Sequence, residues 1–342
     1  MRACVVHGAK DLRVEDRPAR DAGPGEVAID VAVGGICGSD LHYYNHGGVG
    51  EFRLAEPMVL GHEIAGHVAA LGPGVDGPSV GSAVAVHPAT PCGECAECRQ
   101  GRRNVCTNVR YLGSAARFPH VQGGMSERVV VPAPQVRVLP PGLDLHGAVL
   151  AEPLAVALHA VHRAGDPAGA RVLVTGAGPI GCLVVAALRH IGASEIVASD
   201  LLAEPLSVAR KLGATALVRP QGTASLAWPE PLDVAIEASG SPAGLRTCLE
   251  RVRPGGTVVQ VGLLPPGDVG VPAVRMVTRE VTLRGSFRFD GEFDEALELL
   301  ASGLDVGAMV TGSFPLAEAA AAFELASDRS RACKVLLEVG RD

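Results

Sequence analysis

The stretch RVLVTGAGPIG, residues 171–181, joins a run of β-branched residues to a turn that is rich in glycine. Its glycines follow the pattern G-x-G-x-x-G, which after a strand and before a helical run such as CLVVAALRHIG predicts a dinucleotide-binding turn. Gly176 allows the tight turn, Gly178 lets a pyrophosphate approach the backbone, and Gly181 lets helix and strand pack closely. The N-terminus of the helix offers free N–H groups to the phosphates. A glycine pattern alone is also compatible with a flexible loop, so the prediction depends on the flanking strand and helix.

The residues around this motif predict a complete doubly wound domain. From about residue 150, short β-branched runs alternate with Ala- and Leu-rich helical stretches, which is typical of βαβ units and a parallel sheet. The strand candidates are RVLVTG (171–176), EIVASD (195–200), TALVR (215–219), DVAIEAS (233–239), TVVQVG (257–262) and VTLRGS (281–286). Six strands complete a dinucleotide-binding domain, which we expect at residues 149–289.

An acidic residue at the end of the second strand indicates which nucleotide is bound. Asp200 lies 19 residues beyond Gly181, where a carboxylate can accept hydrogen bonds from both ribose hydroxyls of adenosine. Because a 2′-phosphate would meet like charge there, the sequence favours NAD over NADP. The alternative is a solvated carboxylate at a strand end.

The remaining sequence predicts a second domain built from both ends of the chain. Residues 1–148 contain short alternating apolar runs, such as EVAIDVAVGGI and EIAGHVAALG, broken by Gly and Pro turns, which predicts a β-rich domain. The helical stretch EFDEALELLASG, another near 316–326 and a last strand, CKVLLEV (333–339), exceed what the parallel sheet needs. We therefore expect residues 290–342 to pack back on the first domain.

The composition excludes several classes of function. Hydrophobic residues make up 47% and charged residues 20% of the 342 residues, as in ordinary globular proteins. The formal net charge is −7 and basic residues are scattered, so no nucleic-acid partner is expected. We find no signal-peptide pattern and no apolar run of membrane-spanning length. Nine cysteines, an odd number, without an export signal favour the cytoplasm and metal binding over disulfides.

Four of these cysteines lie in one segment, PCGECAECRQGRRNVC (91–106). The spacing C-x2-C-x2-C-x7-C lets one loop surround a tetrahedral zinc with four thiolates, from Cys92, Cys95, Cys98 and Cys106. Such a set leaves no open position for substrate or water, so we expect a structural zinc in a lobe at residues 91–107. The alternatives are an iron–sulfur cluster, for which the other features of a ferredoxin motif are missing, and unliganded thiols.

Catalysis by zinc needs an open site with three protein ligands, which can come from distant parts of the chain. Candidate segments are GGICGSDLHYY (34–44), VLGHEIAGH (59–67) and AVLAEPLAVALHA (148–160). Each is weak alone, because Cys37 could be a small buried hydrophobe, His62 a turn histidine and Glu152 a charge at a helix N-terminus.

In this combination and order, the motifs resemble the zinc-dependent medium-chain dehydrogenases over essentially the whole chain. The resemblance implies an α/β protein, with a GroES-like β-rich catalytic domain and a Rossmann NAD-binding domain. It implies that Cys37 and His62 bind a catalytic zinc and that Asp40 holds the ring of His62. Alcohol dehydrogenases have a second cysteine where this chain has Glu152. The carboxylate is the polyol (sorbitol) dehydrogenase version, in which Glu63 also lies at the metal.

The carboxylate ligands indicate the substrate class. A carboxylate in place of a soft thiolate makes zinc a stronger Lewis acid and favours oxygen ligands, including two hydroxyls of one polyol. The segments GGICGSDLHYYNHGGVGEFRLAEPMVLGHE, YLGSAARFPHVQGGMSE, AEPLAVALHA and LRGSFRF resemble the L-idonate 5-dehydrogenase branch, which interconverts L-idonate and 5-keto-gluconate. Dehydrogenation of sorbitol, xylitol or threonine is the alternative within the family. A metal-stabilised binding protein is the alternative that is not an enzyme.

A sugar acid carries a carboxylate, so we expect an unpaired cation facing the zinc. Arg288, in SFRF, matches a position of the polyol dehydrogenases near substrate and nicotinamide, and it is the first choice for this cation. Arg117 and His120, in ARFPH, are the second, and Tyr43 is a further substrate candidate. For either arginine the alternative is a surface salt bridge.

The resemblance also implies a proton path and further cofactor contacts. Ser39 would lie beside the reacting oxygen and His42 at the solvent end of a relay, since a histidine that titrates near neutrality suits this task. The alternatives are a turn serine and a strand histidine. The expected cofactor contacts, besides the glycines and Asp200, are Pro179, Ile180, Val261, Gly262 and Phe287.

Two expectations about assembly and cofactors complete the resemblance. Many relatives carry Arg a few residues after the ribose-binding aspartate, where this chain has Pro205, so NADP stays open as an alternative to NAD. The family forms dimers or tetramers, and we expect a homotetramer with two zinc ions per chain.

Overall fold

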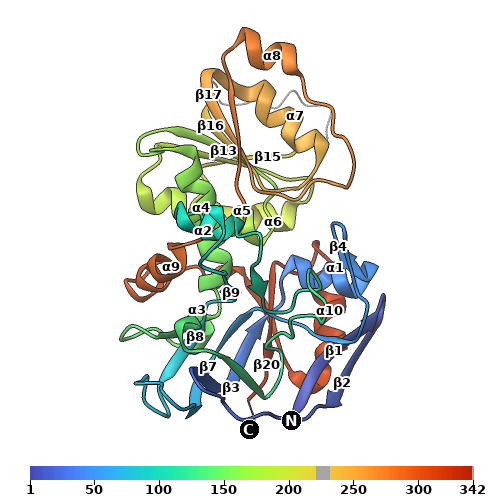
Figure 1. The fold of residues 1–342 in the computed structure, drawn as a ribbon. Coiled ribbons are helices and arrows are strands. Elements are labelled where there is room, and N and C mark those ends of the chain that lie inside the picture. Colours follow the sequence, from blue (N-terminus) through green and yellow to red (C-terminus); the bar gives the residue numbers. More distant parts are fainter. Residues whose placement is uncertain (221–231, 341–342) are drawn as a thin grey trace.

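A six-stranded parallel sheet forms around the glycine-rich turn (Figure 1). It is seen in a computed structural model, in which residues 1–220 and 232–340 are described. The strand order is β15-β14-β13-β16-β17-β18, and all neighbours are parallel. The strands are β13 (Arg171–Thr175), β14 (Glu195–Ser199), β15 (Ala216–Val218), β16 (Leu232–Glu237), β17 (Val252–Gln260) and β18 (Thr282–Gly285). Because the order reverses at β13, the predicted doubly wound sheet is confirmed.

The predicted strand bounds hold within two residues, except at the start of β17. This strand begins at Val252 rather than Thr257 and runs through RPGG, which resembles a turn in sequence. The pairing with β16 shifts register between Leu232 and Val234, and such a bulge lets the strand continue past the glycines.

Helices cover both faces of this sheet. On one face α4 (Ala151–Ala164), α5 (Pro179–Ile191) and α6 (Ala203–Leu212) pack side by side, and α7 (Pro242–Arg251) and α8 (Ala273–Thr278) lie on the other. The side chains of β13 alternate accordingly: Val172 and Val174 belong to the core under α4 and α5, and Leu173 to the core under α7. The middle of the central strand, Val172 to Val174, is therefore apolar on both faces, as in a sheet with two covered faces.

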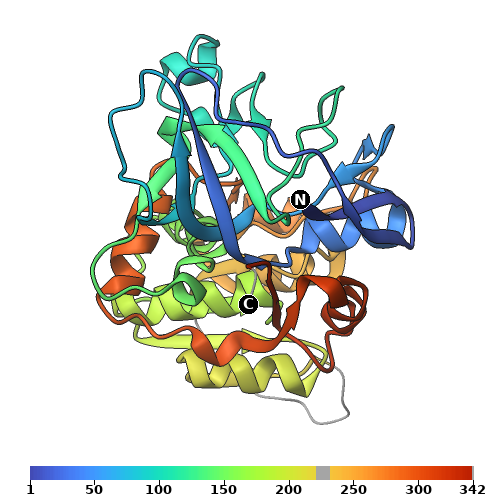
Figure 2. The ribbon, with the colours of Figure 1, turned by 90° about the horizontal axis from the view of Figure 1, so that it is seen from below.

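A second, mixed sheet is formed by both ends of the chain. Its strands run in the order β12-β8-β7-β3-β20-β19, and β11 also pairs with β3. They are β3 (Glu26–Gly35), β7 (Glu63–Leu71), β8 (Ala83–Val86), β11 (Arg128–Pro132), β12 (Val136–Val138), β19 (Val310–Pro315) and β20 (Lys334–Glu338). Since β20 is antiparallel to β3, the C-terminal segment returns to the first domain. Figure 2 shows this return, with the red C-terminal elements beside the blue N-terminal ones.

Smaller elements complete the chain. They are β1 (Arg2–Gly8), β2 (Asp11–Asp16), α1 (Gly38–His46), β4 (Gly48–Val49), β5 (Phe52–Arg53), β6 (Met58–Val59), β9 (Ala89–Thr90), α2 (Ala96–Arg99), β10 (Arg110–Tyr111), α3 (Leu145–Ala148), α9 (Glu292–Ala301) and α10 (Ala319–Ser327). Short 3-10 turns lie at Arg103–Val105, Ala133–Gln135, Gly307–Met309 and Leu316–Glu318. The two helices expected near the C-terminus are thus α9 and α10. In the described part of the chain, no helix has the length and apolar character needed to cross a membrane.

The strand pairing supports our division of the chain. We propose residues 1–148 with 290–342 as one domain and residues 149–289 as the other. These ranges include residues 221–231 and 341–342, which lie outside the described residues.

Two glycines of the motif make a matched test of its two roles. A Cβ atom at Gly181 would lie 1.8 Å from the carbonyl oxygen of Gly176, whereas a Cβ at Gly178 would meet nothing within 4 Å. We predict that Gly181→Ala destabilises the protein by about 2–3 kcal/mol through overpacking. Gly178→Ala should leave the free energy of unfolding within about 1 kcal/mol and weaken dinucleotide binding at least about 10-fold, because its methyl group occupies the path of the pyrophosphate.

Denaturant unfolding and fluorescence titration with NADH measure the two effects. Equal loss of stability in both variants, or unchanged nucleotide affinity in Gly178→Ala, would contradict the assignment of these glycines.

Candidate active site

A cavity of about 660 Å³ lies at the carboxyl ends of the parallel strands. On this side it is lined by residues that directly follow β13, β16, β17 and β18, including Gly178, Gly240, Gly262 and Arg288. The opposite wall comes from the start of α1, from the turn before β7 and from Glu152. A cavity at the carboxyl ends of a doubly wound sheet is where such folds bind nucleotides.

Three predicted metal ligands meet in this wall. The ligand atoms of Cys37, His62 and Glu63 all lie within 4.8 Å of one another. Cys37 is the N-cap of α1, and His62 and Glu63 follow Gly61 at the start of β7. Gly61 has φ +95°, and a Cβ there would lie 2.4 Å from Met125, so this turn requires glycine.

A buried carboxylate joins the two segments. Asp40 is fully buried, and its Oδ2 accepts a hydrogen bond from the Cys37 backbone N–H (3.0 Å) while Oδ1 accepts one from that of Gly61 (3.1 Å). Its Oδ1 also lies 3.9 Å from Nδ1 of His62. Burial raises the pKa of Asp40, and the nearby His62 opposes that shift. The distance between Asp40 and His62 is thus too long for the predicted contact to be a hydrogen bond. The stronger role of Asp40 is to hold the backbone at Cys37 and at Gly61.

Glu63 and Glu152 lie in different surroundings. Both oxygens of Glu63 are 2.8 Å from Nζ of Lys334, a buried residue at the start of β20. Glu152 lines the same cavity from the first turn of α4 but is not part of the three-residue cluster. Its Oε1 accepts a hydrogen bond from the hydroxyl of Tyr111 (2.7 Å), and burial raises the pKa of Glu152. Lys334 and Tyr111 were not among the residues predicted from sequence.

The donor set fits a divalent zinc ion. Nδ1 of His62 is buried and has no hydrogen-bond partner among the described residues. Three carboxylates, of Asp40, Glu63 and Glu152, are buried in and behind this wall, and Lys334 is the buried lysine beside them. A bound cation would offset the cost of burying these acids together. A thiolate, an imidazole and a carboxylate are also the ligand types of open zinc sites.

Arg288 has an unusual conformation above this cluster. Its backbone adopts φ 54°, a left-handed conformation that costs a non-glycine residue about 1–2 kcal/mol. The guanidinium carbon lies 4.5 Å from the ring centroid of Tyr111 and 4.7 Å from that of Phe287. Within residues 1–220 and 232–340, no carboxylate forms a salt bridge with Arg288. A cation that faces the cavity without an ion pair is what the sequence predicted at this position.

The remaining candidates from the first domain divide into two groups. Ser39 and His42 line the cavity from α1, so His42 is a helix residue and not a strand residue. Burial lowers the pKa of His42. Tyr43 also lines the cavity, and its hydroxyl accepts a hydrogen bond from the Ala115 N–H (2.9 Å).

Arg117 and His120 are not brought to the cavity. Arg117 donates to the carbonyl oxygen of Thr107 (2.8 Å), and His120 is buried between Ala55 N–H (2.9 Å) and the Arg117 carbonyl (2.7 Å). Both side chains are engaged by backbone groups, so of the predicted substrate cations only Arg288 lines the cavity.

The predicted cofactor residues lie along the other wall. The residues that line the cavity are Gly178, Pro179, Ile180, Val261, Gly262 and Phe287. Gly176 forms the tight turn with φ +89°, and Gly181 packs against it. Asp200 is buried behind them, where its Oδ2 accepts from the Ala177 N–H and from Nη2 of Arg329, each at 2.8 Å. Arg329, which follows α10 and lines the cavity, was not foreseen from sequence.

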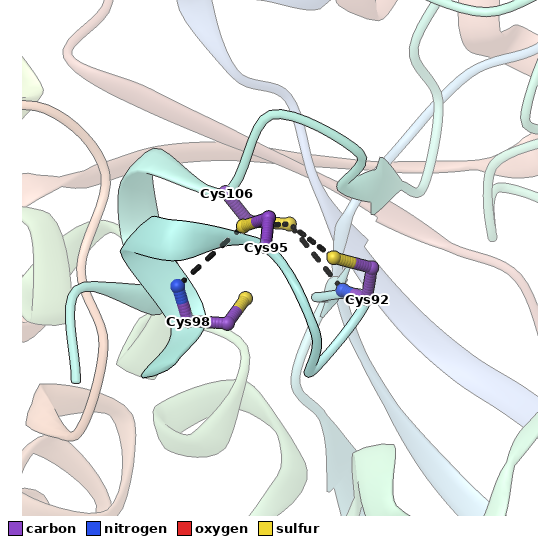
Figure 3. Close-up of side chains that lie close together, drawn as sticks. All are labelled: Cys92, Cys95, Cys98 and Cys106. Carbon is purple, nitrogen blue, oxygen red and sulfur yellow. Dashed lines mark hydrogen bonds between the residues drawn. The ribbon is translucent and has the colours of Figure 1, made fainter. Parts of the chain in front are cut away.

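The four cysteines of residues 91–106 converge as predicted (Figure 3). Cys106 Sγ lies 3.5 Å from Cys92 Sγ and 3.9 Å from Cys95 Sγ, and all four are free thiols. The Cys98 N–H that donates to Cys95 lowers the pKa of Cys95 to about 6. Four facing sulfurs with backbone donors suit a closed zinc site.

Comparisons with known proteins agree with this geometry. Residues 23–141 match the alcohol dehydrogenase GroES-like domain, and residues 179–302 match the zinc-binding dehydrogenase domain. The chain is 40% identical over 339 residues to L-idonate 5-dehydrogenase (NAD(P)(+)) of Escherichia coli, covering 98% of each chain. A crystal structure of that protein superimposes with a TM-score of 0.93, covering 98% of this chain and 97% of the other.

Two further relatives extend the comparison. Sorbitol dehydrogenase of Bacillus subtilis is 35% identical over 349 residues, covering 100% of this chain and 98% of the relative. A zinc-binding dehydrogenase structure from Sinorhizobium meliloti, bound to NADP, has a TM-score of 0.90 at 32% identity and covers 98% of each chain. Two domain matches in the predicted order and near-complete coverage at this identity show that the chain belongs to the zinc-dependent medium-chain dehydrogenases.

Proposed function

We propose that this oxidoreductase transfers a hydride between NAD and an oxygen-rich alcohol, most specifically L-idonate, which is oxidised to 5-keto-gluconate as NAD is reduced. The observation that carries the substrate class is Arg288, a guanidinium that has no ion pair among the described residues and faces the same cavity as the Cys37 cluster. Such a group binds a carboxylate through paired, charge-assisted hydrogen bonds. The similarity to L-idonate 5-dehydrogenase supports the same substrate.

Each residue of the wall has a defined task in this reaction. Cys37, His62 and Glu63 would hold the catalytic zinc, with Glu152 close enough to act directly or through water. When bound, zinc supplies a Lewis acid that favours the deprotonated hydroxyl, and nicotinamide accepts the hydride. Lys334 orients Glu63, because it contacts both carboxylate oxygens.

The proton released by the hydroxyl leaves through α1. Ser39 and His42 line the cavity in this order along the helix. Because burial lowers the pKa of His42, its imidazole is neutral at pH 7 and can accept a proton. We therefore assign Ser39 the contact with the reacting hydroxyl and His42 the transfer toward solvent.

The cofactor preference depends on the surroundings of Asp200. Its carboxylate suits the two ribose hydroxyls of NAD. Arg329 pairs with the same carboxylate and offsets the charge that would repel a 2′-phosphate. We propose that the enzyme prefers NAD and also accepts NADP.

Assembly and location complete the proposal. Strand β18 is the outer strand of its sheet, its four residues are exposed, and Val274 and Val277 nearby are 78% and 77% exposed. An open edge beside apolar side chains is a common site of subunit pairing, which supports a homotetramer, or a dimer. The described cysteines, nine in all, are free thiols, which supports a cytoplasmic protein with two zinc ions per chain.

The second candidate function is a polyol dehydrogenase. The 35% identity to sorbitol dehydrogenase and the carboxylate-rich metal cluster favour sorbitol or xylitol over threonine. A binding protein without catalysis would have no use for a cofactor wall and an open metal cluster in one cavity.

Replacement of Arg288 separates a sugar acid from a neutral polyol. We predict that Arg288→Ala raises KM for L-idonate about 10- to 100-fold, the loss of about 1.5–3 kcal/mol for hydrogen bonds between charged groups. KM for sorbitol should change less than about threefold. The control is Arg284→Ala on β18, whose side chain donates to the Arg163 carbonyl outside the cavity. Steady-state kinetics on a panel of alcohols tests both claims, and activity restricted to simple alcohols would refute the substrate class.

Replacement of Arg329 tests the cofactor proposal. Arg329→Ala should weaken NADP binding about 10-fold, because one charge pair worth about 1.4 kcal/mol is lost. NAD binding should stay within about twofold. Fluorescence titration with NADH and NADPH measures both constants, with Arg210→Ala, at the far end of α6, as control. An equal change for both cofactors would show that Arg329 only links the two domains.

A further inference from the structure

We propose that the four-cysteine lobe, residues 91–107, positions Arg288 for substrate binding through Arg103 and Asn104. The lobe would then act on substrate affinity while its thiolates take no part in the chemistry. The inference rests on the proposed function, in which Arg288 binds the substrate carboxylate.

The lobe contacts the chain on both sides of Arg288. Asn104 Nδ2 donates to the carbonyl oxygen of Phe287 (3.0 Å). Arg103 uses two donors on one carboxylate: its backbone N–H contacts Oδ2 of Asp290 (3.1 Å) and its Nε contacts Oδ1 (2.8 Å). The residue before Arg288 and a residue just after it are therefore fixed by adjacent residues of the lobe.

These contacts hold a backbone conformation that Arg288 would not adopt by itself. Its φ of 54° is in the left-handed region, and such a residue persists only when its surroundings fix the flanking chain. If the backbone of Arg288 left this conformation, its side chain would point in a different direction. The orientation of the Arg288 guanidinium therefore depends on the contacts that hold the flanking backbone.

The base of the lobe provides the ring on which the guanidinium stacks. Strand β9 enters the lobe and β10 leaves it, and the two pair with Tyr111 opposite Ala89. The Arg288 guanidinium lies over the Tyr111 ring, whose hydroxyl in turn contacts Glu152. The guanidinium of Arg288 is therefore supported by Tyr111 at the base of the lobe. The backbone around Arg288 is held by Arg103 and Asn104 within the lobe.

The cysteine cluster fixes the two contact residues in turn. Arg103 and Asn104 lie in the 3-10 turn that ends at Cys106, and Cys106 Sγ accepts hydrogen bonds from the N–H groups of Cys92 and Asn108. A metal on the four thiolates would rigidify this turn. The geometry of the substrate cation is then linked to an ion that substrate never meets.

Kinetics of an Arg103→Ala/Asn104→Ala double variant test this link. The holoenzyme is assayed with L-idonate and with the neutral polyol that reacts fastest, and zinc per chain and Tm are measured in parallel. The matched control is Arg102→Ala, because Arg102 is exposed in the same turn but pairs with Glu97 inside the lobe. Asp290→Asn, which removes the ion pair alone, replaces the double variant if that protein does not fold.

We expect KM for L-idonate to rise about 10-fold, with kcat and KM for the neutral polyol within about twofold and zinc unchanged. Arg288 should also react several-fold faster with phenylglyoxal, measured by peptide mass spectrometry. The control should match the unmodified enzyme in all of these measurements.

The possible failures are distinguishable. If Arg288→Ala raises KM for L-idonate but the double variant does not, the positioning role of the lobe is wrong. If both substrates are affected equally, or zinc is lost, the lobe has only a general structural role and the inference is overturned. If Arg288→Ala itself leaves KM for L-idonate unchanged, the proposed carboxylate contact fails, and the inference fails with it.

Discussion

The buried carboxylate of Asp40 is the interaction on which the candidate site depends. It accepts a hydrogen bond from the backbone of Cys37 and another from Gly61, two residues that are separated in the chain by helix α1 and three short strands. A fully buried acid with no such donors would be strongly destabilising, so both segments must approach it together. Their approach brings Cys37, His62 and Glu63 within reach of one ion.

Charge balance explains the rest of the wall. The cluster contains more buried acids than bases, and Lys334 compensates only Glu63. A divalent cation would offset the charge of the acids that Lys334 does not pair. The closed four-cysteine set differs because its ligands come from a single loop and leave no position open. The described residues thus offer two metal-ligand clusters whose ligand types predict opposite access to substrate.

The fold and most of the site could be predicted from local sequence. The six strands follow the β-branched runs, and the glycine turn has a spacing with a direct steric reason, as the 1.8 Å contact at Gly181 shows. The start of β17 was missed because RPGG predicts a turn, whereas a bulge carries the strand through it. Cys37, His62 and Glu152 were each weak indications of a metal site. Only their combination with the other motifs predicted one.

Residues that act through distant contacts could not be predicted in this way. Lys334, Tyr111 and Arg329 have ordinary sequence surroundings, and each contacts a partner that is far away in the sequence. Arg117 and His120 were predicted from their motif to bind substrate. In the structure, their side chains form hydrogen bonds with backbone groups instead. Sequence spacing predicts a metal site best when its ligands are close together in the sequence. Contacts between distant residues depend on the topology of the fold.

Zinc content of a Cys37→Ser variant, measured together with its hydride-transfer rate, tests the central claim most directly. The account predicts two zinc ions per chain in the unmodified enzyme, and one in the variant, with hydride transfer abolished and Tm within about 5 °C. A variant that keeps two zinc ions and full hydride transfer would contradict the assignment of the catalytic metal to Cys37, His62 and Glu63.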